Sequence, residues 1–246
     1  MQAGTARDLE GWNARLENEN AETLVAWAAE RFGAGLVMSS SFGATSAVML
    51  HLVTRVAPET PVIFVDTGYL FSETYRFAAE LERRLDLRLH VVAPRTTTAM
   101  QEALHGERWE QGDEGVADYL RTNKVEPMRR ALDELDATAW LAGLRSEQTA
   151  HRSGLRRVDV QDERVKVHPI LHWSAEDVEA YLVRHDLPVH PLVAEGYRSI
   201  GDVHSTLPTT PDMDPRDGRI LGRSRECGLH LPMSPATAES LKSSGL

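Results

Sequence analysis

Cys227 is the only cysteine of this 246-residue chain, and its neighbours suit a reactive thiol. It lies in Arg223-Ser224-Arg225-Glu226-Cys227-Gly228-Leu229-His230, close to the C-terminus. The thiolate is the nucleophilic form of cysteine, and nearby cationic groups favour it. The opposite interpretation is a buried cysteine that packs as a small hydrophobic side chain. The two arginines and the histidine favour the reactive interpretation, so Cys227 is the candidate catalytic residue.

A second group of candidate residues follows the ends of predicted strands. In open α/β sheets, ligands bind beyond the carboxyl ends of the strands. A serine-rich turn before a helix can hold an anion with backbone N–H groups, although such turns also serve simply as N-caps. An acidic residue at a strand end can bond ribose hydroxyls or an adenine amine, or it can only cap a turn. The three strand ends carry Ser39, Ser40, Ser41, Phe42 and Gly43, then Asp66-Thr67-Gly68, and then Gly143-Leu144-Arg145.

Basic residues complete this set of candidates. Each is ambiguous alone, because arginine and lysine also serve as solvated surface residues. Together they could place several cations around one polyanionic ligand, through charge-assisted hydrogen bonds. The cations in question are Lys124, Arg145, Arg152, Arg216 and Arg219.

The elements that must position these residues alternate between strand and helix. Short apolar runs predict strands, and apolar stripes at helical spacing predict the helices between them. This order predicts a doubly wound, mostly parallel α/β sheet flanked by helices. We expect helices at 21–32, 44–56, 72–85 and 125–135, and strands at 36–38, 61–65, 87–92 and 139–142; a further helix follows Ser174 as N-cap, with Asp177 as its capping-box partner.

The sequence changes character after residue 186. Residues 1–186 are expected to form the α/β nucleotide-binding domain, including N-terminal helices. Five prolines lie between positions 188 and 215, among many Ser, Thr, Asp and Gly residues. Long segments without regular structure are usually functional or disordered. Because residues 187–246 end in the Cys227 motif, we expect a mobile functional tail; the alternative is a terminus without consequence.

Composition excludes several classes of protein. The formal net charge is −10, which disfavours binding of nucleic acid by a basic surface. A single cysteine excludes an intrachain disulfide and an iron–sulfur cluster held by four cysteines of this chain. No histidine or cysteine spacing indicates a zinc site. No signal peptide or membrane helix is apparent, so we expect a cytoplasmic protein without membrane contact.

Several motifs of the chain resemble those of one enzyme family, the assimilatory phosphoadenylyl-sulfate (PAPS) reductases, which use thioredoxin to make sulfite. The resemblance spans about residues 20–230. The family belongs to a wider group of adenine-nucleotide enzymes, alpha-hydrolase-like in fold, with a modified phosphate loop. The matching motifs are Ser39-Ser40-Ser41-Phe42-Gly43-Ala44, Val65-Asp66-Thr67-Gly68-Tyr69-Leu70-Phe71, Glu73-Thr74-Tyr75-Arg76-Phe77, Trp109-Glu110-Gln111-Gly112, Asn123-Lys124-Val125-Glu126-Pro127-Met128, Ala142-Gly143-Leu144-Arg145, Glu147-Gln148, Glu195-Gly196-Tyr197 and Arg225-Glu226-Cys227-Gly228-Leu229-His230.

This resemblance implies a role for each candidate residue. Ser39 to Gly43 would form the phosphate loop, and Asp66 and Gly68 would line the adenosine pocket. The cations Lys124, Arg145, Arg216 and Arg219 would face the phosphosulfate, Arg152 would contact the 3′-phosphate, and His230 would join the substrate-binding set.

The resemblance also implies the reaction. Cys227 would attack the sulfur of PAPS, release adenosine 3′,5′-bisphosphate and keep a Cys–S–sulfonate. Reduction to sulfite takes two electrons, but the chain has one thiol, so a second thiol must come from another molecule. Thioredoxin or glutaredoxin would supply it, and the family resemblance further implies a homodimer.

A sister branch of the family, the adenylyl-sulfate (APS) reductases, carries a four-iron cluster on two cysteine pairs. Tyr119-Leu120 stand at the first pair here, and Asp202 and Ser205 at the second. We therefore expect no iron–sulfur cluster, no metal and no other resident cofactor, with PAPS as the substrate. Arg216-Asp217-Gly218-Arg219 resembles the APS branch, which keeps APS open as an alternative substrate.

Two further alternatives remain open. A sulfurylase subunit or ATP-pyrophosphatase of the same superfamily would show a Ser-Gly-Gly-x-Asp-Ser loop, a pattern that Phe42 and Thr45 break. A non-catalytic nucleotide-binding protein would use Cys227 only as a redox sensor. Such a protein would yield no sulfite, which separates it from the reductase.

Overall fold

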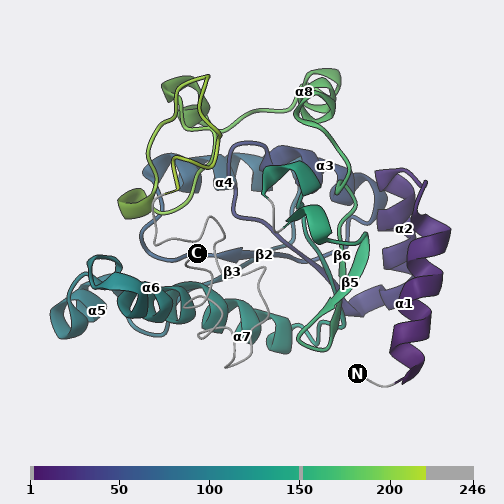
Figure 1. Cartoon of the computed structure of the whole chain (residues 1–246), viewed down its shortest axis with the longest axis horizontal. Helices are drawn as coiled ribbons and strands as arrows, with labels where there is room; N and C mark the ends of the chain where they lie inside the picture. Colours follow the sequence, from purple (N-terminus) through teal and green to yellow (C-terminus); the bar gives the residue numbers. More distant parts are fainter. Residues whose placement is uncertain (1–2, 150–151, 220–246) are drawn as a thin grey trace.

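Six strands form one mixed sheet at the centre of the molecule (Figure 1). The computed structural model describes residues 3–149 and 152–219. The strand order is β3-β2-β1-β4-β6-β5, and every neighbouring pair is parallel except the antiparallel pair β5–β6. This confirms the predicted doubly wound, mostly parallel sheet. The strands are β1 (Leu36–Ser39), β2 (Val62–Val65), β3 (Leu89–Val92), β4 (Ala139–Leu141), β5 (Val158–Gln161) and β6 (Arg164–Val167).

Alternate residues of the central strands serve two separate cores. In β1, Leu36 and Met38 pack on one face of the sheet and Val37 packs on the other. Successive side chains of a strand point to opposite faces, so an all-apolar strand must be covered on both sides. In Figure 1, α3 and α4 lie over one face and α7 lies over the other.

Helices cover both faces, and their bounds agree closely with the predicted ones. The predicted helix at 72–85 is reproduced as α4, and α8 begins after the N-cap Ser174, whose side chain and that of Asp177 form the expected capping box. The helices are α1 (Ala3–Leu16), α2 (Ala21–Phe32), α3 (Ser46–Val56), α4 (Ser72–Leu85), α5 (Thr98–His105), α6 (Gly112–Leu120), α7 (Glu126–Glu134) and α8 (Ala175–Arg184).

A π-helical turn, Arg121–Val125, joins α6 to α7. The sequence predicts only a helix from residue 125, and the π turn before it is a feature that the spacing did not reveal. Pro127 lies in the first turn of α7 and has no N–H to donate to a carbonyl one α-turn earlier. Single π turns often occur at functional sites. This one buries Asn123 and Lys124, and Asn123 donates a hydrogen bond to the loop after β2.

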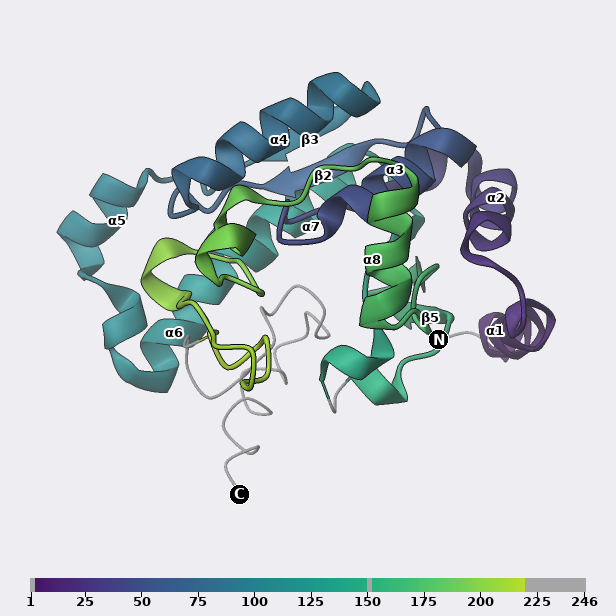
Figure 2. The ribbon, with the colours of Figure 1, turned by 90° about the horizontal axis from the view of Figure 1, so that it is seen from above.

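The proline-rich segment after α8 is irregular but packed through Arg219. Isolated bridges pair Leu70 with Asp202 and Thr206 with Arg219. Leu192 and Ile200 are buried, and short 3₁₀ turns occur at Pro191–Glu195 and Val203–Ser205. In Figure 2 this segment lies beside α4 and α6. Irregular structure therefore begins where the sequence predicts it, but its first part is fixed to the sheet edge by burial.

Candidate functional site

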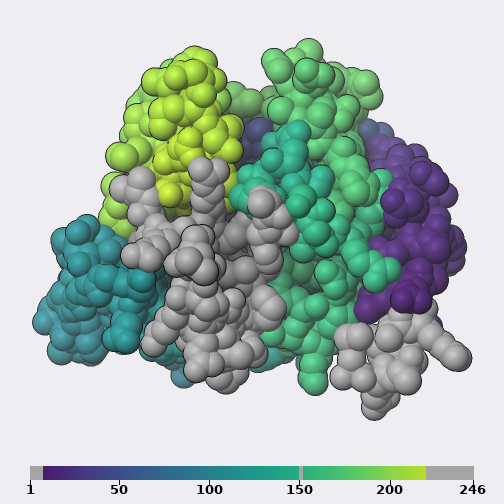
Figure 3. Space-filling view, viewed as in Figure 1, coloured from purple at the N-terminus to yellow at the C-terminus, as the bar shows by residue number. Residues whose placement is uncertain are grey.

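A cavity opens at the carboxyl ends of the parallel strands, between the packed C-terminal segment and α8. In Figure 3 these two parts rise as separate lobes with a hollow between them. The cavity gathers residues from distant parts of the sequence, as the strand-end argument predicts. Nine of the predicted site residues line it: Ser39, Ser40, Ser41, Gly43, Lys124, Arg145, Arg152, Arg216 and Arg219.

The serine-rich turn between β1 and α3 forms one wall of the cavity. Ser40 Oγ accepts a hydrogen bond from the Phe42 amide at 3.1 Å, and Ser46 Oγ donates to the Gly43 carbonyl at 2.9 Å. Ser39 Oγ accepts from the indole N–H of Trp140 at 2.8 Å. The turn leads directly into α3, whose N-terminus adds partial positive charge at the cavity. The arrangement is suited to holding a phosphate group.

Phe42 is placed differently from its serine neighbours. Its side chain is fully buried, packs edge-on against Phe64 at 4.7 Å between ring centroids, and does not line the cavity. Its backbone has a φ of 49°, a left-handed conformation that is unusual for a bulky residue. Phe42 therefore anchors the turn in the core. Any contact of this residue with a ligand would come from its backbone.

Arg145 and Arg152 line a second wall, on the loop after β4. Arg145 pairs with Glu147, with 2.6 Å between Nη1 and Oε1, and Arg152 donates to Gln148 Oε1. Arg152 is almost completely buried, which is rare for an arginine unless it is paired, as it is here with Gln148. Burial lowers the pKa of Arg145, but a guanidinium remains charged at neutral pH.

A network of four buried residues, three of which line the cavity, joins the loop after β2, the π turn and the C-terminal segment. Lys124 Nζ lies 2.5 Å from Asp202 Oδ2, and Thr67 Oγ1 donates to Asp202 Oδ1 at 2.6 Å. Asn123 Nδ2 donates to the Thr67 carbonyl at 3.0 Å. Burial alone would raise the pKa of Asp202, but the Lys124 ammonium and the Thr67 hydroxyl offset it and hold that pKa below its usual range.

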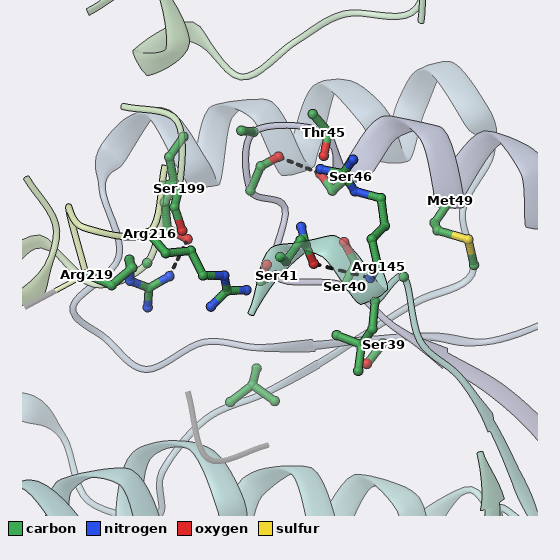
Figure 4. Close-up of a pocket in the computed structure, with 18 of the residues that line it drawn as sticks. Ser39, Ser40, Ser41, Thr45, Ser46, Met49, Arg145, Ser199, Arg216 and Arg219 are labelled. Carbon is green, nitrogen blue, oxygen red and sulfur yellow. Dashed lines mark hydrogen bonds between the residues drawn. The ribbon is translucent and has the colours of Figure 1, made fainter. Parts of the chain in front are cut away.

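The C-terminal segment contributes a third wall with Arg216 and Arg219. Arg219 Nη1 donates to the Ile200 carbonyl at 3.2 Å, and its guanidinium packs so closely on Gly201 that a Cβ there would clash with it. In Figure 4, Arg216 and Arg219 lie on one side of Ser41 and Arg145 lies on the other. Cations from two separate walls therefore face the serine-rich turn.

Asp66 and Gly68 do not line the cavity. Asp66 Oδ1 accepts from the Gly68 amide at 2.8 Å and from the Tyr75 hydroxyl at 2.6 Å, which closes the turn after β2. Gly68 has a φ of 77°. Thr67, between them, is the member of this triplet that lines the cavity. Their assignment to an adenosine pocket stays a prediction.

Several residues that line the cavity were not predicted from the sequence. Gln148, Ser199 and Asp202 belong to the cavity. Gln148 lies in one of the family motifs, Asp202 stands at a position of the sister branch's second cysteine pair, and Ser199 carries no such signal. The predicted residues Cys227 and His230 lie outside the described residues. Their roles stay predictions.

Tyr119, at one of the four positions compared with cluster cysteines, packs against the turn that carries Asp202 and Ser205, two of the others. Tyr119 lies against His204, with ring centroids 4.9 Å apart, and His204 stacks on Trp109 at 4.0 Å. Asp202, from the same turn, holds Lys124. Within residues 3–149 and 152–219, no group of three His, Cys, Asp or Glu side chains could hold a metal ion.

No helix in the described part of the chain has the length and apolar character needed to cross a membrane.

The sheet order and the helices on both faces define an α/β fold of the adenine nucleotide alpha-hydrolase-like type. A solved structure of Candida glabrata FMN adenylyltransferase shares this fold with a TM-score of 0.54 and 16% identity, over 95% of this chain and 80% of that chain. At that identity the likeness concerns the fold alone.

More specific matches identify the family. The phosphoadenosine phosphosulfate reductase domain family matches residues 35–208. A phosphoadenosine 5′-phosphosulfate reductase of Synechocystis sp. is 52% identical over 98% of both chains, and one of Alkalilimnicola ehrlichii is 52% identical over 91% of both. A solved PAPS reductase from Candida auris, in a phosphate complex, matches with a TM-score of 0.72 and 29% identity, over 81% of this chain and 96% of that one. The chain belongs to the phosphoadenosine phosphosulfate reductase family of oxidoreductases, which confirms the resemblance.

Proposed function

We propose that this protein reduces PAPS to sulfite and adenosine 3′,5′-bisphosphate in assimilatory sulfate reduction, in the cytoplasm. The observation that carries the proposal is the convergence of a serine-rich turn and five predicted cations on one strand-end cavity. PAPS is a polyanion with a 3′-phosphate and a phosphosulfate. A cavity with this charge and these hydroxyl groups is suited to both, through charge-assisted hydrogen bonds.

Cys227 performs the chemistry in this proposal. Its thiolate attacks the sulfur of the phosphosulfate, the bond between that sulfur and the bridging oxygen breaks, and adenosine 3′,5′-bisphosphate leaves. A Cys–S–sulfonate remains on the protein. A thiolate of thioredoxin or glutaredoxin then attacks Cys227 Sγ, sulfite departs, and the second thiol of the partner resolves the mixed disulfide. The two electrons thus come from the partner dithiol.

The cations assist each stage without a resident cofactor. Lys124, Arg145, Arg216 and Arg219 stabilise the charge that develops on the departing phosphate, and Arg152 binds the 3′-phosphate. The reaction requires no metal or iron–sulfur cluster of this chain. We further propose that the protein works as a homodimer, following its family resemblance.

Sulfite release tests this function. The purified protein is incubated with reduced thioredoxin and either PAPS or APS, and sulfite is measured. PAPS should give sulfite at a higher kcat/KM than APS, and Cys227→Ser should give none while it still binds adenosine 3′,5′-bisphosphate. Ser224→Ala, a hydroxyl change in the same segment, is the matched control. Equal use of APS would show that the Arg216-Asp217-Gly218-Arg219 tail was the better guide, and no sulfite from either nucleotide would favour a redox sensor.

A further inference from the structure

We infer that Asp202 is a positioning residue for the reaction, which acts through Lys124. The inference rests on the proposed function, since it concerns how the cavity presents one of its cations. Asp202 and Lys124 both line the cavity, yet they come from segments far apart in the chain. Their side chains are 0% and 7% exposed, and the charged atoms are 2.5 Å apart.

Lys124 needs a charged partner because its side chain is buried. The lysine lies on the π turn before α7, with its long side chain directed into a buried position. A lysine side chain has several rotatable bonds, so burial in one conformation needs a specific contact. Taking an ammonium out of water is also unfavourable unless an opposite charge and hydrogen bonds replace the solvent. Asp202 supplies the opposite charge and holds the Lys124 side chain in one conformation.

Asp202 is itself fixed from two sides. Thr67 donates to its other oxygen at 2.6 Å, and the backbone bridge to Leu70 holds its segment against the loop after β2. Asn123, the neighbour of Lys124, donates to the Thr67 carbonyl. The π turn, the loop after β2 and the C-terminal segment therefore meet at one carboxylate. This geometry sets where the Lys124 ammonium stands relative to the ligand.

The pair also links the lysine to Arg219 of the C-terminal segment. Gly201 precedes Asp202 and packs on the Arg219 guanidinium, and Ile200 accepts a hydrogen bond from it. The carboxylate that places Lys124 thus lies on the same short stretch that places Arg219. Asp202 is negatively charged, like the anionic ligand, and repels it. Charge alone would therefore predict that removal of the carboxylate strengthens ligand binding. If Asp202 positions Lys124, removal of the carboxylate should instead weaken binding and lower activity.

A double-mutant cycle separates these two predictions. The variants are Asp202→Asn, Lys124→Ala and the double variant, with Asp136→Asn as control. Asp136 is exposed and has a φ of 46°, which asparagine also tolerates. The Kd for adenosine 3′,5′-bisphosphate and the kcat/KM for PAPS are measured for each protein. Binding of the bisphosphate does not depend on Cys227 chemistry, so a failure of the proposed reaction and a failure of this inference remain distinguishable.

Asp202→Asn should lower kcat/KM about tenfold or more, and the double variant should be no worse than Lys124→Ala, which is the strong coupling expected of contacting charges. Ethylammonium added to Lys124→Ala should restore part of the activity, but it should restore none in the double variant. Rescue does not depend on overall stability, so it stays informative if Asp202→Asn folds less well. Additive losses, rescue in both proteins, or tighter binding by Asp202→Asn would overturn the inference.

Discussion

The indole N–H of Trp140, on β4, donates a hydrogen bond to Ser39 Oγ, at the end of β1, across 2.8 Å. Trp140 is buried in the core on the α7 side of the sheet, while Ser39 begins the turn that lines the cavity. One hydrogen bond thus joins the packed sheet to the first residue of the candidate phosphate loop. The packing of the core therefore fixes the position of the loop.

Replacement of Trp140 by phenylalanine tests that relationship. Trp140→Phe keeps an aromatic ring but removes the N–H, so Ser39 Oγ loses its donor. We expect a loss of unfolding free energy of about 1–3 kcal/mol and a several-fold rise in the Kd for adenosine 3′,5′-bisphosphate. Urea unfolding and calorimetric titration measure the two effects. Trp173→Phe, a partly buried tryptophan near α8, is the control; an unchanged Kd in Trp140→Phe would show that the hydrogen bond does not position the loop.

Arg152 is expected to read the extra phosphate of PAPS. A charge-assisted hydrogen bond is worth roughly 1.5–3 kcal/mol, or about tenfold or more in discrimination. Arg152→Ala should therefore narrow the ratio of kcat/KM for PAPS over APS by at least about tenfold, while APS turnover changes little. Arg156→Ala, at an exposed arginine of the same loop, should leave the ratio unchanged. A proportional fall with both nucleotides would instead assign Arg152 to the structure of the loop.

The buried His168 should make the folded protein less stable in acid. It is 1% exposed and its Nδ1 lies 2.7 Å from the Arg156 carbonyl; burial, together with the positive charge of Lys166, lowers its pKa to about 4. The unfolded chain takes up this proton near pH 6.5 and the folded protein only near pH 4. The contribution of His168 to the free energy of unfolding is therefore fully present above pH 6.5, and it falls by on the order of 3 kcal/mol as the pH drops to 4.

Urea unfolding between pH 7 and pH 4 measures this effect. His168→Asn keeps an N–H near the Arg156 carbonyl and cannot titrate, so the dependence of its unfolding free energy on pH should be shallower than in the wild type. His172→Asn changes an exposed histidine and should keep the wild-type slope. Equal slopes for all three proteins would contradict the assignment.

The absence of a resident cluster is a further prediction. Tyr119, Leu120, Asp202 and Ser205 stand where the sister branch holds cysteines. Protein purified without oxygen should be colourless and should retain full PAPS turnover after treatment with an iron chelator. Iron at one cluster per chain, or loss of turnover on chelation, would refute it.

The periodicity of apolar residues was sufficient to predict the core of the fold. Strands β2 and β4 are apolar throughout and β1 is apolar up to Ser39, while α4 has an amphipathic stripe, so both types of element can be predicted from local sequence. The β5–β6 pair was missed because its turn, Asp162-Glu163, adopts positive φ without glycine. A hairpin signal usually depends on Asn-Gly or a similar dipeptide.

The cavity was predictable where residues follow strands and not where they arrive from elsewhere. Ser39 and Arg145 follow β1 and β4, so strand-end topology places them together. Asp202 lies in an irregular segment, and its place beside Lys124 depends on a single bridge to Leu70 and a π turn. No periodic pattern encodes such contacts, and only the tertiary structure reveals them.

Intact-protein mass spectrometry tests the central claim most directly. The wild-type protein is incubated with PAPS in the absence of any thiol reductant, and its mass is compared with that of Cys227→Ser treated in the same way. A lone thiol cannot resolve its own adduct, so the wild type should gain one sulfonate, mapped to Cys227, and should lose it with release of sulfite when reduced thioredoxin is added. The serine variant should gain nothing. Cleavage of PAPS by a wild-type protein whose mass stays unchanged would contradict the account.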